Sequence, residues 1–303
     1  MDAIVTERLT QNYGNVRALK EVSFAVHRGE LYGIIGADGA GKTTLFRILA
    51  TLILPKSGRA WVDGYDVKAQ YKEIRQRVGY MPGRFSLYLD LSVEENLSFY
   101  ASVFGTTIRE NYALVAPIYK QIEPFARRKA GNLSGGMKQK LALCCALIHK
   151  PSVLFLDEPT TGVDPVSRQE FWEMLATLRS YGITILVSTP YMDEANRCDR
   201  IALMREGEFM QVDTPQHIIA SYRETLWAAA SDDMYRLLGD IRNFKGVKRC
   251  YTFGVEHHFT ADEVTVESLR AYLATRGYKE LTIRRVSATI EDCYMQLEDK
   301  YHG

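Results

Sequence analysis

The sequence predicts an α/β fold, a mostly parallel sheet covered by helices, followed by a small α+β unit. Up to about Ile219, short apolar runs alternate with segments of helical periodicity, and this alternation is what such a sheet produces. A glycine-rich turn joins one of these runs directly to a helical segment. After Thr214 and Pro215 the order of the expected strands and helices changes. We therefore predict one domain over residues 1–220 and a second over residues 221–303.

The strands expected in the first domain are short, apolar and bounded by turn residues. They cover Leu31 to Ile35, Val153 to Leu156, Ile183 to Ser188 and Ile201 to Met204. A helical subdomain is expected at about residues 84–150, with a helical insertion between Arg84 and Lys129. Within it, Ser92 and Glu95 have the spacing of a capping box, in which each side chain binds a backbone amide of the other residue.

The second domain is expected to be a small α+β unit. Its strands are expected near Thr225 to Ala230, Lys248 to Phe253, His257 to Thr260 and Leu281 to Val286. Its helices are expected at Asp232 to Arg242, Val266 to Arg276 and Ile290 to Glu298. His257 and His258 would point to opposite faces of a strand, which is poor geometry for binding one metal ion.

Composition and charge exclude several classes of protein. The 38 Lys and Arg residues balance 37 Asp and Glu residues, so the net charge of +1 provides no field that would attract nucleic acid. The longest apolar stretches, such as Leu141 to Ile148, are far shorter than the roughly 18 residues needed to cross a bilayer. The N-terminus lacks the features of a signal peptide, and the five cysteines include no Cys-x-x-Cys pair. We therefore expect a reduced, cytoplasmic protein that binds no nucleic acid.

The most specific motif is a turn that fits G-x-x-x-x-G-K-[ST], follows an apolar strand and precedes a helical run. Its glycines let backbone amides close around a polyphosphate, and the helix N-terminus adds positive dipole character. Lys42 is expected to neutralise the β and γ phosphates of ATP, and the Thr43 hydroxyl to bind Mg²⁺. An isolated match could be a plain linking turn, but the strand before it and the helix after it argue against that alternative. The expected phosphate-binding residues are Gly36, Ala37, Asp38, Gly39, Ala40, Gly41, Lys42, Thr43 and Thr44.

An apolar strand that starts at Val153 ends in two carboxylates, Asp157 and Glu158. A strand end of this kind is often merely solvated. Beside a phosphate-binding loop, however, the first carboxylate holds Mg²⁺, usually through water, and the second polarises the attacking water as a general base. We therefore predict that Asp157 is a metal ligand and that Glu158 is the catalytic residue.

A third motif, LSGGMKQ at residues 133–139, directly precedes a strongly helical run. Ser134 is placed to cap that helix, and Gly135 and Gly136 would let backbone amides approach a phosphate closely. The segment could also be a simple helix cap. Together with the phosphate loop and the acidic pair, it resembles the signature of the ABC ATPase family, and the resemblance extends over nearly the whole first domain.

The resemblance implies a fold, ligands and partners. The fold is a P-loop NTPase cassette with an antiparallel β subdomain and a helical insertion, and the ligands are ATP and Mg²⁺. In this family two cassettes meet head to tail, as a homodimer or a heterodimer, and the signature of one covers the γ-phosphate bound by the other. By resemblance, Tyr13 stacks on adenine and Asp164 contacts the second cassette. The segment from Val286 to Asp292 resembles the C-terminal element of ATPases from ABC-2 type exporters.

Two positions depart from the family pattern. Gly83 stands where the family usually has a glutamine after Tyr-x-Pro, and Pro190 stands where it usually has a histidine that contacts the γ-phosphate. Proline has neither an imidazole nor a backbone donor. Losing one hydrogen bond to a charged phosphate costs about 1.5–3 kcal/mol, or roughly one to two decades in rate. We therefore predict slow but real hydrolysis, with Ser188, Thr189 or Arg84 as candidate substitutes.

Three functions are compatible with these motifs. The first is the ATP-binding and ATP-hydrolysing subunit of an ABC-2 type exporter, peripheral on the inner face of the cell membrane, which drives a separate integral membrane permease contacted through the helical insertion. The second is a soluble non-transport ABC ATPase that acts on ribosomes or DNA. Such proteins generally carry two cassettes or a long coiled-coil insertion, whereas one phosphate loop and one signature occur here. The third is a nucleotide-binding partner with weak hydrolysis in a heteromeric transporter, which Gly83 and Pro190 keep open.

Overall fold

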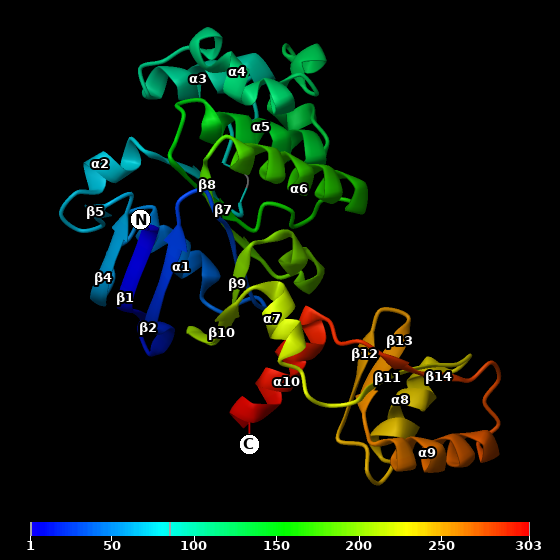
Figure 1. Ribbon diagram of the computed structural model, residues 1–303. Coiled ribbons are helices and arrows are strands. Elements are labelled where there is room, and N and C mark those ends of the chain that lie inside the picture. Colours follow the sequence, from blue (N-terminus) through cyan, green and yellow to red (C-terminus); the bar gives the residue numbers. More distant parts are fainter. Residues whose placement is uncertain (1, 85, 303) are drawn as a thin grey trace. The chain divides into compact units, whose positions relative to one another are not determined.

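The computed structural model describes residues 2–84 and 86–302, and the chain divides into two compact units, Met1–Pro215 and Gln216–Gly303 (Figure 1). The sequence pattern places the limit near residue 220 instead. The difference arises at α7 (Pro215–Ala220), where the Ile218 carbonyl lies 3.6 Å from the Cys293 thiol of the second unit. Within the described part of the chain, every helix is too short or too polar to cross a bilayer.

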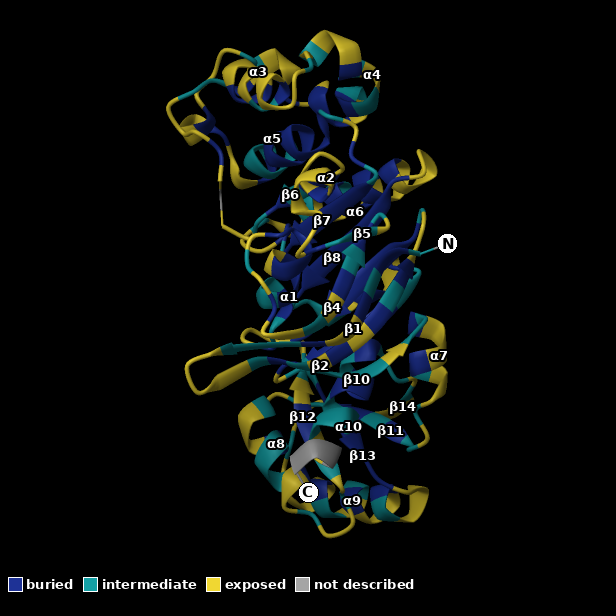
Figure 2. Ribbon diagram, turned by 90° about the vertical axis from the view of Figure 1, so that its left-hand side faces the viewer, coloured by how far each residue is buried: buried dark blue, intermediate teal, exposed yellow. Residues whose placement is uncertain are grey.

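The first unit is built around a six-stranded sheet. All neighbouring strands in it are parallel except the β9–β10 pair, which is antiparallel. Three strands, β3 (Leu31–Ile35), β7 (Val153–Asp157) and β8 (Thr184–Thr189), are buried at every position, which explains their largely apolar sequences. Figure 2 shows β7 and β8 in dark blue, the colour of buried residues. The expected parallel sheet is confirmed. Its strand order is β10 (Glu208–Asp213), β9 (Arg200–Arg205), β3, β8, β7, β6 (Val78–Met81).

A second, antiparallel sheet of four strands is built from the N-terminal part of the chain, as the family resemblance implies. Its order is β2 (Val16–His27), β1 (Asp2–Tyr13), β4 (Ser57–Val62), β5 (Tyr65–Asp66), and β5 leads to the short helix α2 (Tyr71–Arg75). Helix α1 (Lys42–Leu49) shares one hydrophobic core with both sheets, in which Phe46 meets Phe155 edge to face. The loop between β3 and α1 is therefore fixed at both ends by buried elements.

Three helices lie side by side at one end of the first unit (Figure 1). The first, α3 (Val93–Val103), starts at the predicted capping box. Ser92 Oγ accepts from the Glu95 amide at 3.2 Å, and Glu95 Oε2 accepts from the Ser92 amide at 2.7 Å. The other two are α4 (Ile108–Tyr119) and α5 (Gly135–Leu147), which starts at the LSGG motif. The remaining helical segments are α6 (Pro165–Ser180) and the 3₁₀ helices η1 (Glu123–Phe125), η2 (Ala130–Asn132) and η3 (Met192–Arg197).

The second unit contains a four-stranded antiparallel sheet of order β12-β13-β11-β14 with β-α-β-β-α-β connections, the arrangement of a ferredoxin-like domain. Its core includes Leu237, Phe259 and Leu269. Helix α9 begins before the expected Val266, because Asp262 caps it. The elements are β11 (Leu226–Ala230), α8 (Met234–Arg242), β12 (Arg249–Phe253), β13 (Glu256–Thr260), α9 (Glu263–Thr275), β14 (Thr282–Val286) and α10 (Ile290–His302).

A buried polar network connects α10 to the sheet of the second unit. Asp292 is 1% exposed, and its Oδ1 accepts hydrogen bonds from the Tyr251 hydroxyl at 2.5 Å and from His258 Nδ1 at 2.6 Å. Its Oδ2 accepts from the amide and the hydroxyl of Thr289, both at 2.7 Å. His257 Nε2 instead lies 2.6 Å from a backbone carbonyl of α8. The C-terminal segment singled out in the sequence is therefore the cap of α10 and its attachment to the sheet.

Candidate functional site

The loop between β3 and α1 requires glycine at two positions. A Cβ on Gly36 would lie 2.2 Å from the Met204 carbonyl oxygen, and a Cβ on Gly41 would lie 2.4 Å from the Ala18 carbonyl oxygen. Gly41 also has a φ of 106°, a conformation that L residues rarely adopt. The loop thus packs directly on the backbones of β2 and β9. No side chain caps the first amides of α1, so they can bind an anion.

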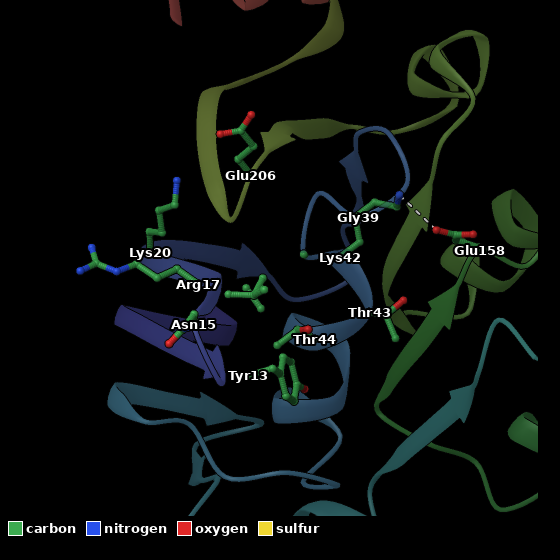
Figure 3. A pocket seen from close by; sticks show the side chains of 13 residues that line it. Tyr13, Asn15, Arg17, Lys20, Gly39, Lys42, Thr43, Thr44, Glu158 and Glu206 are labelled. Carbon is green, nitrogen blue, oxygen red and sulfur yellow. Dashed lines mark ion pairs between the residues drawn. The ribbon is translucent and has the colours of Figure 1, made fainter.

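The Lys42 side chain folds back onto this loop and binds its carbonyl groups. Its Nζ donates to the carbonyls of Gly36 at 2.7 Å and Ala37 at 2.9 Å, and lies 3.1 Å from Glu158 Oε1 (Figure 3). The residue is 3% exposed. A buried ammonium group with one carboxylate partner can exchange that partner for phosphate oxygens, which carry more negative charge.

Asp157, the last residue of β7, accepts hydrogen bonds from two hydroxyl groups. Its Oδ1 accepts from Ser188 Oγ at 2.7 Å and from Thr43 Oγ1 at 3.2 Å. Burial raises the pKa of Asp157, and the hydrogen bonds from Ser188 and Thr43 only partly offset that rise. A divalent cation beside Asp157 would stabilise the charged carboxylate and reverse this balance.

The oxygen atoms around Asp157 fit Mg²⁺, which binds one or two carboxylates together with phosphate oxygens and water. Thr43 and Asp157 provide a hydroxyl and a carboxylate oxygen 3.2 Å apart. Among residues 2–84 and 86–302, no group of three or more His, Cys, Asp or Glu side chains could hold a metal ion. A magnesium ion beside Thr43 and Asp157 would take its other oxygens from water or from a bound phosphate.

One cavity of about 530 Å³ brings many of the predicted residues together (Figure 3). Tyr13 is 47% exposed at this cavity, and a ring so exposed can stack on a flat base. The predicted residues that line the cavity are Tyr13, Gly39, Gly41, Lys42, Thr43, Thr44 and Glu158. The other predicted loop residues lie in the same turn but outside the lining, and they are Gly36, Ala37, Asp38 and Ala40.

Four polar residues of the lining are absent from the sequence predictions: Asn15, Arg17, Lys20 and Glu206. Arg17 and Lys20 lie on β2, which follows Tyr13 closely in the sequence, so their proximity to Tyr13 is the signal that could have found them. Glu206 lies in the turn between β9 and β10. That turn reaches the loop through tertiary contacts such as the hydrogen bond from the Gly207 amide to the Ala40 carbonyl at 2.8 Å, for which the sequence carries no signal.

Comparison with known proteins agrees with this geometry. The family model described as "ABC transporter" matches residues 19–161. Over 219 residues the chain is 42% identical to the "Probable multidrug ABC transporter ATP-binding protein YbhF" of Escherichia coli K12, covering 72% of this chain and 38% of that protein. Over 214 residues it is 42% identical to the "Nod factor export ATP-binding protein I" of Burkholderia orbicola, covering 70% of each chain. The chain belongs to the family of ABC transporter ATP-binding proteins.

A solved ABC cassette has the same fold as the first unit. It is a dimeric post-hydrolysis state of the cassette MJ0796 bound to ADP and phosphate, with a TM-score of 0.62 and 25% sequence identity, covering 70% of this chain and 98% of that chain. ADP and phosphate are the products of ATP hydrolysis, so the ABC family to which this chain belongs is a family of ATPases. The predicted P-loop cassette fold is confirmed.

The ABC signature lies outside the cavity of its own chain. Ser134 caps α5 by accepting a hydrogen bond from an amide of that helix at 3.4 Å. Gly136 packs against α6, where a Cβ would lie 2.6 Å from Ser167 Oγ. Asp164 caps α6 by accepting from the Ser167 amide at 3.0 Å. The residues predicted from the family motif that do not line the cavity are Ser134, Gly135, Gly136 and Asp164.

Gly83, the first departure from the ABC pattern, borders the acidic pair. A Cβ at this position would lie 3.0 Å from the Asp157 carbonyl oxygen and 3.7 Å from Glu158 Cβ. A side chain here would therefore lie against the backbone of Asp157 and beside the side chain of Glu158. The contact with the Asp157 carbonyl is tight, so a larger residue requires a small shift of that backbone.

Pro190, the second departure, directly follows Thr189 at the end of β8. The candidate substitutes Ser188 and Thr189 donate their hydroxyl hydrogens to buried carboxylates, at 2.7 Å for Ser188. A hydroxyl group has one hydrogen, so neither residue can also donate to a phosphate in this arrangement. Arg84, which is exposed in the loop after β6, is the remaining candidate.

Proposed function

We propose that this chain is the ATP-binding and ATP-hydrolysing subunit of an ABC-2 type exporter, which drives a separate membrane permease by ATP-driven dimerisation. Residues 1–220 are proposed as the ABC ATP-binding domain, residues 84–150 as its helical subdomain, and residues 221–303 as an accessory domain. The observation that carries the proposal is one cavity in which Lys42, Thr43 and Glu158 converge. The names of the two relatives, a multidrug transporter and a Nod factor exporter, support the direction of transport.

Some of the site residues bind ATP, and Glu158 acts in its hydrolysis. Tyr13 stacks on adenine, and the loop amides bind the triphosphate. Lys42 exchanges Glu158 for phosphate oxygens, because a polyphosphate offers more negative charge than one carboxylate. Thr43 and Asp157 hold Mg²⁺, which supplies charge neutralisation at the phosphates when bound. Glu158, released from Lys42, accepts a proton from the water that attacks the γ-phosphate.

A second cassette completes the site. Ser134, Gly135 and Gly136 lie outside the cavity of their own chain, which supports the proposal that their backbone amides bind a phosphate held by another cassette. Head-to-tail pairing supplies such a phosphate to both chains at once, as a homodimer or with a related partner. Asp164, at the start of α6, is proposed to contact the second cassette.

A groove beside the helical insertion is the proposed contact with the permease. It is a cavity of about 470 Å³ whose lining includes Met81, Tyr100, Val103 and Phe104. Val103 is 60% exposed, and Tyr88 on the same part of the unit is 50% exposed. Exposed apolar groups around a groove are typical of a protein contact, and an apolar helical segment from a cytoplasmic loop of the permease fits it. The chain would then be peripheral on the cytoplasmic face of the membrane.

The hydrolysis proposal is tested by comparing ATP turnover of the wild-type chain with that of Glu158→Gln. We expect Glu158→Gln to lower turnover by about 10²-fold or more, because it removes the general base. With ATP and Mg²⁺ the same variant should elute as a dimer in size-exclusion chromatography, since the trapped nucleotide holds two cassettes together. Glu173→Gln, an exposed position on α6, is the matched control. Equal turnover of wild type and Glu158→Gln would refute hydrolysis by this chain.

The permease proposal is tested by recovery of the chain with solubilised membranes. Val103→Glu places a charge in the groove and should abolish co-purification with an integral membrane protein. Val255→Glu, at an 86% exposed position of the second unit, is the control and should leave it intact. Equal recovery of both variants would exclude the groove as the contact.

A second candidate function rests on Gly83 and Pro190, which lack the side chains that touch water or phosphate in the family. In that case the chain binds ATP in a heterodimer while a partner cassette hydrolyses it. Turnover of the isolated chain distinguishes the two candidates: a value above that of Glu158→Gln supports the exporter ATPase, and a value equal to it supports the nucleotide-binding partner.

A further inference from the structure

A buried carboxylate outside the predicted site binds side chains from three segments of the first unit. Glu194, on η3, is 4% exposed. Its Oε2 accepts hydrogen bonds from the hydroxyls of Thr160, at 3.1 Å, and of Thr189. Its Oε1 lies 3.0 Å from Nε of Arg168 on α6. One side chain thus binds the loop after the acidic pair, the end of β8 and the start of α6.

Two of these segments form the hydrolytic side of the site. Thr160 is two residues beyond Glu158 in the same loop. Thr189 precedes Pro190, its hydroxyl accepts from the Tyr191 amide at 3.0 Å, and its carbonyl accepts from the amide of Gly36 at 3.3 Å. The carboxylate of Glu194 therefore connects the loop after Glu158 to the residue that precedes Pro190.

The backbone at Glu158 needs such support. Its φ is 51°, in the left-handed region that non-glycine residues rarely adopt and that persists only where the surrounding structure holds it. On its amide side, Glu158 N donates to the carbonyl of Ser188 at 3.1 Å and to its hydroxyl at 3.0 Å. On its carboxyl side, the Glu158 carbonyl accepts from the Thr161 amide at 3.2 Å, and Thr160, which is 1% exposed, donates its hydroxyl to Glu194.

We propose that Glu194 is a positioning residue for ATP hydrolysis: it holds Thr160 and Thr189 so that Glu158 keeps the strained backbone that aims its carboxylate at the attacking water. The inference rests on the proposed function and assigns this role to a residue outside the cavity lining. It also gives the loop at Pro190 a fixed position without an imidazole contact with phosphate, since Thr189 is bound by Glu194 and by the Tyr191 amide.

The variant Glu194→Gln tests the role without dismantling the fold. Glutamine keeps the length of the side chain and one carbonyl oxygen, but it cannot accept from Thr160, Thr189 and Arg168 together. Arg168 keeps an ion pair with Asp193 at 3.2 Å, so the change leaves no unpaired buried cation.

We expect Glu194→Gln to lower kcat between about 10-fold and 100-fold, the range for a displaced catalytic group, while the Kd for ATP stays within about twofold. In the Glu158→Gln background the same change should have no further effect on turnover, because Glu194 acts through Glu158. Glu173→Gln on α6 is the control for loss of a carboxylate and should behave like wild type.

Three outcomes would overturn the inference: turnover of Glu194→Gln within about twofold of wild type, an equal loss of affinity and turnover, or an additional loss in the Glu158→Gln background. The second and third would show that Glu194 serves only the fold. A wild-type turnover no higher than that of Glu158→Gln is a different result, since it overturns the proposed hydrolysis and this inference with it.

Discussion

Each unit of this protein contains a carboxylate bound by neighbouring side chains, yet the two carboxylates differ in burial and in whether their partners can be replaced. In the first unit, Glu158 borders a cavity of about 530 Å³ and holds its partner Lys42 at 3.1 Å in a position where phosphate can replace it. In the second unit, Asp292 is 1% exposed and both of its oxygens are occupied by Tyr251, His258 and Thr289. A carboxylate at the edge of a cavity is thus available for chemistry when its partner can be exchanged, whereas an enclosed carboxylate with both oxygens occupied holds the surrounding structure in place.

This difference predicts that substitutions around the cavity of the first unit change the rate of hydrolysis and the affinity for ATP. Substitutions at Asp292 in the second unit should instead change stability. The predictions below test that division, beginning with the largest expected effect.

Replacing Lys42 should have the largest effect. Lys42→Ala removes the cation from the phosphate loop and should lower ATP turnover by about 10²- to 10³-fold, as for loss of one preorganised charge-stabilising donor. ATP affinity should fall as well, which isothermal titration calorimetry measures. Lys72→Ala, at an exposed position on α2, is the control. An unchanged affinity in Lys42→Ala would contradict the assignment of the phosphate loop.

Restoring the family residues should raise turnover. Pro190→His supplies a donor near the γ-phosphate and is expected to increase kcat by roughly one to two decades, equivalent to about 1.5–3 kcal/mol. Gly83→Gln should give a smaller gain, because its Cβ would lie 3.0 Å from the Asp157 carbonyl oxygen and displace that backbone. Steady-state phosphate release measures both. If Pro190→His fails to accelerate hydrolysis, the missing imidazole is not what limits this site.

Asp292→Asn should act on the second unit alone. The amide cannot accept from Tyr251, His258 and Thr289 as the carboxylate does, and a buried group left unsatisfied costs about 1–3 kcal/mol. Hydrogen exchange should become faster in β12 and β13, while ATP affinity of the chain stays at the wild-type value. A change in ATP affinity without faster exchange would contradict the division between the two units.

The smallest expected effect is a loss of stability of the second unit at low pH. Burial raises the pKa of Asp292, but hydrogen bonds from His258, Tyr251 and Thr289 outweigh it, and the folded pKa lies below the ordinary value. This contribution to stability is present above the unfolded pKa of about 3.9 and is lost as the pH falls through the folded pKa. Urea denaturation of the wild type at decreasing pH should show this loss, and Asp292→Asn should lack it.

Local patterns determined much of this protein. The fully buried strands β3, β7 and β8, the turn around Lys42, and the acids at the end of β7 were all predicted, because each depends on a short run of residues and its hydrogen bonds. The capping box of α3 was predicted for the same reason. The helix start at Glu263 was missed, since the cap residue Asp262 precedes the apolar pattern that defines the helix.

Only the tertiary structure decided which distant residues meet the site. Glu206 reaches the cavity because β9 pairs with β3, and a strand order of this kind is not encoded in the period of either strand. Glu194 binds Thr160 across 34 positions of the sequence, and Gly136 faces Ser167 of another helix. Such contacts depend on how elements pack. The sequence alone therefore predicted the phosphate-binding residues, and the packing determined which groups hold the proposed catalytic carboxylate in place.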